Sequence, residues 1–105
     1  MKRGILKRGI TGFLDLIVLS LLRQESMHGY GLIAEVHDRF RVLISPGTLY
    51  PLLARLEEAG LVSSSVDERR RRSYVLLERG EERLEEMLGK LAEFEMALSL
   101  LKSEK

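Results

Sequence analysis

Residues 45–60 read SPGTLYPLLARLEEAG, and this stretch decides the fold of the chain. Ser45 suits a helix N-cap because its hydroxyl accepts a backbone N–H, and Pro46 suits the first helical position. The apolar residues recur at three- and four-residue steps, at Leu49, Leu52, Leu53 and Leu56. Because Gly60 is a typical helix stop, we predict an amphipathic helix that ends near Ala59.

Pro51 leaves the start of this helix open. Its ring and its missing N–H are poorly tolerated inside a helix. A helix that begins at Thr48 avoids the conflict, whereas a helix that begins at Ser45 is bent by Pro51.

Two further helices are predicted upstream of this one. Phe13 to Arg23 is apolar on nearly all sides, which is typical of a central, buried helix. Residues 24–27 form a polar break, and His28 to Phe40 form the next helix. The apolar side of that helix is predicted to consist of Tyr30, Ile33, Val36 and Phe40.

Downstream of Gly60, two short apolar segments are predicted to form a β-hairpin. Residues 61–66 and 73–77 are the strands, and residues 67–72, Asp-Glu-Arg-Arg-Arg-Arg, are the loop. The loop lacks an Asn-Gly type of signal, so the sequence does not predict its turn geometry.

One long helix is predicted from Glu78 to about Lys102. Its apolar seam repeats in heptads and is widened by Leu88 and Ala97. The seam consists of Leu84, Met87, Leu91, Phe94, Leu98 and Leu101.

Three helices, a hairpin and a long helix are the element order of a winged helix-turn-helix. The fold class is therefore mainly α with a small β-hairpin. A third helix with a free outer face fits a DNA major groove, and the hairpin tip would bring Arg69–Arg72 to phosphates or to the minor groove. We assign residues 1–77 to the winged helix-turn-helix domain and residues 78–105 to a C-terminal dimerisation helix.

Composition and charge agree with one small domain. The chain has 105 residues, 45% apolar and 31% charged, and no cysteine. It carries no stretch long enough to cross a bilayer and is expected in the cytoplasm. Residues 1–77 hold twelve Lys and Arg against eight Asp and Glu, whereas residues 78–105 hold five against eight. This asymmetry indicates that residues 1–77 bind a polyanion. The first residues, with Lys2, Arg3, Lys7 and Arg8, form either a basic arm that contacts phosphate or an unstructured start of the chain.

No enzyme is expected, because no nucleophile–base pair, glycine-rich phosphate loop or paired carboxylates in an apolar setting occur in the sequence. His28 and His37 are nine residues apart and cannot share a metal on one helical face. We expect no metal and no cofactor.

Three blocks of sequence resemble the PadR family of transcriptional regulators. They are residues 27–30 (MHGY), 45–53 (SPGTLYPLL) and 55–61 (RLEEAGL), and the resemblance covers roughly residues 10–88. It implies a winged-helix repressor that binds DNA as a homodimer paired through its C-terminal helix. Family members usually have Thr, two residues and Gly before the last helix. Here that stretch is Leu77-Glu78-Arg79-Gly80, which leaves the start of the last helix in doubt.

Some members of that family bind aromatic or drug-like effectors between the halves of the dimer. Phe94, Met87 and Met96 are available here, but they are ordinary core residues first.

The predicted winged helix-turn-helix and the family resemblance together indicate two sets of site residues. DNA contacts are expected from Lys7, Arg8, His28, Tyr30, Ser45, Thr48, Tyr50, Pro51, Arg55, Arg69, Arg70, Arg71 and Arg72. The dimer interface is expected to consist of Leu84, Met87, Leu88, Leu91, Phe94, Leu98 and Leu101.

Alternatives remain at this stage. Tyr50 either sits buried at the rim of its helix or reaches a phosphate, and Arg71 or Arg72 folds back against Glu68 if the arginine run is only a solvated loop. A membrane surface is disfavoured because the polar face of the last helix is acidic. The competing function is a winged-helix module for protein–protein contact that does not bind DNA.

Overall fold

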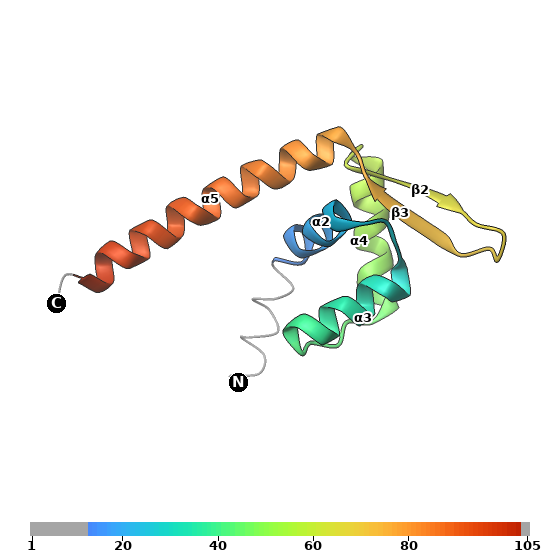
Figure 1. The fold of residues 1–105 in the computed structure, drawn as a ribbon, viewed down its shortest axis with the longest axis horizontal. Helices are drawn as coiled ribbons and strands as arrows, with labels where there is room; N and C mark the ends of the chain where they lie inside the picture. The colour runs from blue at the N-terminus through green and yellow to red at the C-terminus, as the bar shows by residue number, and fades with distance from the viewer. Residues whose placement is uncertain (1–12, 104–105) are drawn as a thin grey trace.

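The computed structural model describes residues 13–103, which form four helices and a three-stranded antiparallel sheet (Figure 1). The helices are α2 (Leu14–Gln24), α3 (Gly29–Phe40), α4 (Pro46–Glu58) and α5 (Glu78–Ser103). The strands are β1 (Met27–His28), β2 (Val62–Val66) and β3 (Arg72–Leu76), in the order β1-β3-β2. The predicted winged helix-turn-helix is confirmed.

Helix α2 is central, as predicted from its apolar composition. Seven of its eleven residues are buried, and they lie on nearly every side of the helix. It packs against α3, β3 and α5, so it forms the middle of the core. Phe13, which immediately precedes the helix, is about half exposed, at 51%.

Helix α4 begins at Pro46, capped by Ser45, whose hydroxyl accepts a hydrogen bond from the Thr48 amide at 3.2 Å. Pro51 therefore lies inside the helix. The predicted leucine stripe is buried, and the helix ends where Gly60 adopts a φ of 77°, a left-handed conformation that glycine accepts readily.

Two predictions for the region before α4 were wrong. Residues 27–28 are not part of a polar break or a helix start, but a short strand that pairs with β3, Met27 opposite Tyr74 and His28 opposite Ser73. Leu32 and Val36 are the buried side chains of α3, whereas Tyr30 and Phe40 are exposed. The predicted apolar face of α3 is therefore confirmed at Val36 and Ile33 and wrong at Tyr30 and Phe40.

The wing, residues 62–76, is the β2–β3 hairpin, within about a residue of the predicted strand limits. Its register pairs Ser64 with Tyr74 and Val66 with Arg72, so residues 67–71 form the turn. Figure 1 shows the wing extending from one side of the helical domain while α5 extends from the other.

Helix α5 starts at Glu78 even though the usual Thr is absent. Gly80 lets the first turn of α5 pack closely, because a Cβ there would overlap the backbone carbonyl of Leu61 and the side chain of Leu76. The helix is thus pressed against the end of α4 and the base of the wing. Arg23 of α2 adds ion pairs to Glu85 at 2.9 Å and to Glu81 at 3.4 Å.

Candidate nucleic-acid interface

The outer face of α4 is open to solvent over its whole length. Thr48, Pro51 and Arg55 are exposed, while the leucines on the opposite face are buried in the core. The Ser45 hydroxyl also lies 3.2 Å from Thr48 Oγ1, so the capping residue orients the first outward side chain. A helix held by one face and free on the other has the shape that enters a major groove.

The four wing arginines fall into two groups. Arg71 Nε donates to Asp67 at 3.1 Å, and Arg72 Nη1 donates to the Ser64 hydroxyl at 2.8 Å. Arg69 and Arg70 are exposed and make no side-chain hydrogen bond or ion pair within the described part of the chain. The alternative in which Arg71 or Arg72 folds back against Glu68 is not what the structure shows, since Asp67 and Ser64 bind these arginines.

A short chain of hydrogen bonds ties the wing to α4. Arg72 donates to Ser64, and the Ser64 hydroxyl in turn donates to Glu57 Oε2 at 2.8 Å. Glu57 lies near the C-terminal end of α4, where a free carboxylate would repel phosphate. Here it is engaged in holding the wing beside the helix.

Tyr30 and Tyr50 pack against each other at the start of α3. Their rings meet edge to face with centroids 6.5 Å apart, and Tyr50 is half-buried while Tyr30 is 69% exposed. The Tyr50 hydroxyl lies so close to Gly29 that any Cβ at that position would overlap it. Tyr50 is thus neither fully buried nor free, and its hydroxyl faces the N-terminus of α3.

A hollow of about 570 Å³ separates the start of α3 from the wing. Among the described residues, its walls contain three arginines and no acidic residue. The lining residues are His28, Gly29, Tyr30, Gly31, Tyr50, Arg70, Arg71 and Arg72. Backbone amides at the N-terminus of α3, the tyrosines and the arginines all favour a phosphate in this space.

Asp67 is the residue of this region that sequence reasoning missed. Its Oδ1 accepts from the backbone amides of Arg69 at 2.9 Å and Arg71 at 2.8 Å, and its Oδ2 lies 3.2 Å from His28 Nε2. The hydrogen bond from the Arg71 amide, helped by that from His28, holds the pKa of Asp67 below its ordinary value. An Asp that opens a loop is a typical Asx-turn signal, which was available in the sequence.

Not every predicted contact can be placed. Lys7 and Arg8, like Lys2 and Arg3, lie outside the described residues. His28 lies at the wing rather than at a metal site, and residues 13–103 contain no cluster of three His, Asp or Glu side chains arranged for a metal. Over the same residues, no helix is both long enough and apolar enough to span a bilayer.

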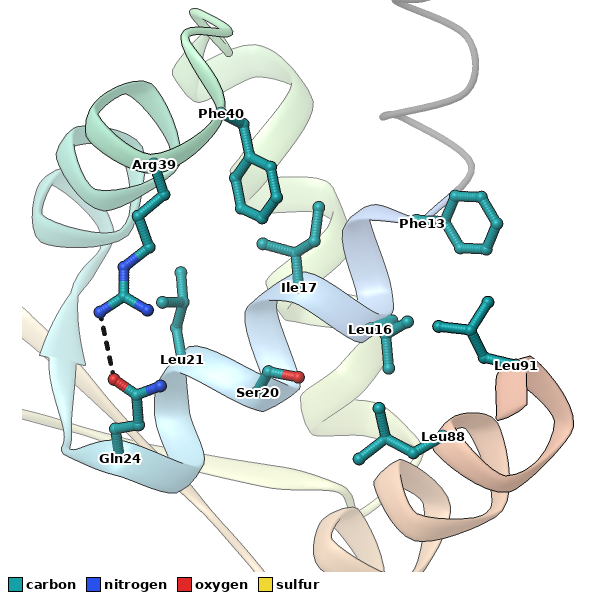
Figure 2. Close-up of a pocket in the computed structure, with 10 residues that line it drawn as sticks. All are labelled: Phe13, Leu16, Ile17, Ser20, Leu21, Gln24, Arg39, Phe40, Leu88 and Leu91. Atoms are coloured by element: carbon teal, nitrogen blue, oxygen red, sulfur yellow. Dashed lines mark hydrogen bonds between the residues drawn. The ribbon is translucent and has the colours of Figure 1, made fainter. Parts of the chain in front are cut away.

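A second exposed surface lies between α2 and α5. Two adjoining apolar hollows, of about 340 and 370 Å³, share Phe13, Leu16 and Leu91. Figure 2 shows Leu88 and Leu91 of α5 directed toward Leu16, with Phe40 directed toward Ile17.

The predicted seam of α5 divides along its length. Leu84 is completely buried in the core of this chain, so it lies inside the domain and not on its surface. Met87, Leu88 and Leu91 are partly buried against that core. Farther along, Phe94 and Leu101 are 61% and 67% exposed, and every residue from 92 to 103 is exposed.

Comparison with known proteins identifies the family. Residues 18–86 match the family described as "Transcriptional regulator PadR-like family". The transcriptional regulator YqjI of Escherichia coli (strain K12) is 34% identical over 77 residues, which cover 71% of this chain and 37% of that protein. An uncharacterized 37.1 kDa protein in transposon TN4556 of Streptomyces fradiae is 35% identical over 75 residues, 71% of this chain and 22% of that protein. The chain thus spans about a third or less of these curated relatives.

Solved structures agree over nearly the whole length. A PadR family transcriptional regulator from Eggerthella lenta DSM 2243 has a TM-score of 0.86 at 29% identity, with 98% of this chain and 93% of that chain covered. A transcriptional regulator from Clostridium thermocellum has a TM-score of 0.76 at 28% identity, covering 92% of this chain and 97% of that chain. The resemblance inferred from the three sequence blocks is therefore confirmed, and the chain belongs to the PadR-like family, whose members are transcriptional regulators rather than enzymes.

Proposed function

We propose that this chain binds double-stranded DNA as a homodimer and represses transcription from a roughly palindromic operator. The observation that carries the proposal is the hollow in which Tyr50 of α4, the start of α3 and three wing arginines come together, while the outer side of α4 is exposed. The α4 helix would enter the major groove, and the wing arginines would contact flanking phosphates. The proposal needs no cofactor and places the protein in the cytoplasm.

Arg69 and Arg70, whose side chains have no partner among residues 13–103, give the direct test of DNA binding. Replacing Arg69 and Arg70 with alanine should weaken binding to the upstream region of the chain's own coding sequence. Two lost phosphate contacts should reduce the slope of log K against log salt by about 1.8. The bonds that hold Arg71 and Arg72 are untouched, so the wing should keep its shape.

A matched control removes the same charge elsewhere. Arg79 and Arg83 are exposed on the first turns of α5, away from the wing turn. Their replacement with alanine should leave the salt slope within about 0.5 of the original, since they would meet no phosphate. Equal losses in both variants would mean that only net charge matters, which contradicts the wing as a contact. A chain that ignores duplex DNA at low salt favours the protein–protein alternative.

The homodimer is supported by the exposed apolar half of α5. An apolar strip of this length is costly in water, and the two hollows beside α2 continue it. A second copy related by a two-fold axis would cover both surfaces at once. Pairing would also set the two α4 helices at a fixed separation, as required for half-sites about 34–36 Å apart.

Two double variants on opposite sides of α5 test this interface. Phe94→Asp with Leu101→Asp should convert the protein from about twice 12.0 kDa to a monomer in sedimentation. Met96 and Leu100 are equally exposed, at 68% and 64%, but Met96 lies about 160° around the helix from Phe94. Their replacement with Asp should leave the dimer intact. Dissociation by the control pair alone would place the interface on the other face.

Repression itself is tested in cells. A reporter driven by the upstream region should rise when the coding sequence is deleted and fall again when the chain is restored. The monomeric variant should fail to restore repression, because half-site binding loses the gain from two linked contacts. A reporter that falls on deletion would make the protein an activator.

A further inference from the structure

Two acidic residues stand next to each other at the tip of a basic wing, and they behave differently. Asp67 accepts hydrogen bonds from two backbone amides and from Arg71 Nε, and its carboxylate contacts His28. Glu68 is exposed and makes no side-chain hydrogen bond or ion pair within the described residues. Asp67 therefore has a carboxylate that shapes the wing turn, whereas the neighbouring Glu68 carries the same charge without such contacts among the described residues.

The bonds to Asp67 define the conformation of the wing turn. The Asp67 backbone closes it from both directions, donating to Arg71 O and accepting from the Arg70 amide, each at 2.9 Å. Arg70 lies at a φ of 61°, a left-handed conformation that is unfavourable for a side chain with a Cβ. The carboxylate satisfies the amides on both sides of Arg70, which compensates for this strain.

The same carboxylate also joins the turn to the helical part of the domain. His28 belongs to β1 and immediately precedes α3, thirty-nine positions before Asp67. One Asp67 oxygen therefore orders the turn, while the other bridges Arg71 and His28 at 3.1 and 3.2 Å. The bridge spans the edge of the hollow that we assign to phosphate.

We infer that Asp67 is a positioning residue for DNA binding, which fixes the directions of Arg69 and Arg70 and ties the wing to β1. The inference rests on the proposed function. It has an unusual consequence, because a carboxylate in a DNA-binding surface repels phosphate. By charge alone, removal of Asp67 should strengthen binding. If Asp67 holds the arginines in place, its removal weakens binding instead.

Three single variants separate geometry from charge, with affinity measured by fluorescence anisotropy on a labelled duplex of the upstream region. Asp67→Asn and Asp67→Ala remove the same charge, but asparagine keeps an acceptor for the two amides. We expect Asp67→Ala to weaken binding about fivefold and Asp67→Asn to weaken it less. Glu68→Gln should leave affinity unchanged or raise it about twofold, since it removes only repulsion. Tighter binding by both Asp67 variants would overturn the inference.

A double-mutant cycle shows whether Asp67 acts through the arginines. In a chain that already carries Arg69→Ala and Arg70→Ala, Asp67→Ala should change affinity by less than about twofold. A full fivefold loss in that background would mean that Asp67 acts through Arg71 or the contact with β1, and the assignment to Arg69 and Arg70 would be wrong. Affinities are compared at a temperature where all variants remain folded by circular dichroism, so that a change in stability does not enter the comparison.

Failure of the inference is distinguishable from failure of the proposed function. If the unmodified chain does not bind the duplex, the proposed function fails, and the inference fails with it. If the Arg69 and Arg70 variant loses affinity and Asp67→Ala does not, DNA binding stands and the positioning role is overturned. Faster hydrogen exchange of the Arg69 and Arg71 amides in Asp67→Ala is expected in either case, and unchanged exchange would contradict the role of the carboxylate in ordering the turn.

Discussion

Individual residues in this chain matter mainly through close approach and directed hydrogen bonds. Gly29 accommodates the Tyr50 hydroxyl, Gly80 accommodates the Leu61 carbonyl, and Asp67 gathers donors from two parts of the chain. In each case the residue type is needed because of a contact with a residue that is distant in the sequence. From the sequence alone, each glycine indicates only a flexible position, and Asp67 indicates only an acidic residue in a loop.

The two glycines of α5 should respond in opposite ways to alanine. A Cβ at Gly80 would overlap rigid backbone, whereas a Cβ at Gly89 would meet no atom of residues 13–103 within 4 Å. Gly80→Ala should lower the free energy of unfolding by about 1–3 kcal/mol through overpacking. Gly89→Ala should raise it by up to about 1 kcal/mol, because alanine favours the helix. Urea denaturation of both variants measures the difference, and equal signs would contradict the packing of α5 on Leu61.

At the scale of elements, local sequence patterns predicted the positions of most helices and strands. Helix periodicity located α2, α4 and α5, whereas the start of α4 stayed open between Ser45 and Thr48 until the structure placed it at Pro46. The exceptions were β1 and the inward face of α3. A two-residue strand has no periodicity, and only its pairing with β3 makes Met27 and His28 extended.

The N-cap of α4 should carry measurable stability. Ser45→Ala removes the acceptor of the Thr48 amide and should cost about 1 kcal/mol in the free energy of unfolding. Ser65→Ala is the control, since Ser65 is an exposed strand residue without a side-chain hydrogen bond among the described residues. Its effect should stay within about 0.5 kcal/mol. A cost as large for Ser65 as for Ser45 would show that capping is not the cause.

At the scale of the whole molecule, the main feature is the exposed second half of α5, whose helical structure has little support from the rest of the described chain. The helix has 26 residues, about 39 Å by its rise, and residues 92–103 of it are all exposed within the described part of the chain. An isolated helix as short as residues 92–103 is only marginally stable in water. In the proposed dimer, we therefore expect the outer half of α5 to depend on the partner for its helical structure.

Coupling between dimerisation and helix order follows from this. In the proposed dimer, the amides of residues 92–103 should be protected from hydrogen exchange, and the unfolding temperature should rise with protein concentration. In the Phe94→Asp, Leu101→Asp variant both effects should disappear, while α2, α3 and α4 keep their protection. Protection of residues 92–103 that survives in the monomer would contradict the need for a partner.

The sequence by itself determined the fold class, the order of the helices and the wing, and the family, because periodicity and short motifs are local. The tertiary structure alone decided that Arg71 and Arg72 are held by Asp67 and Ser64, that Tyr30 is exposed, and that Leu84 belongs to the core. These features depend on contacts between residues far apart in the chain, and local patterns carry no information about which distant side chains meet.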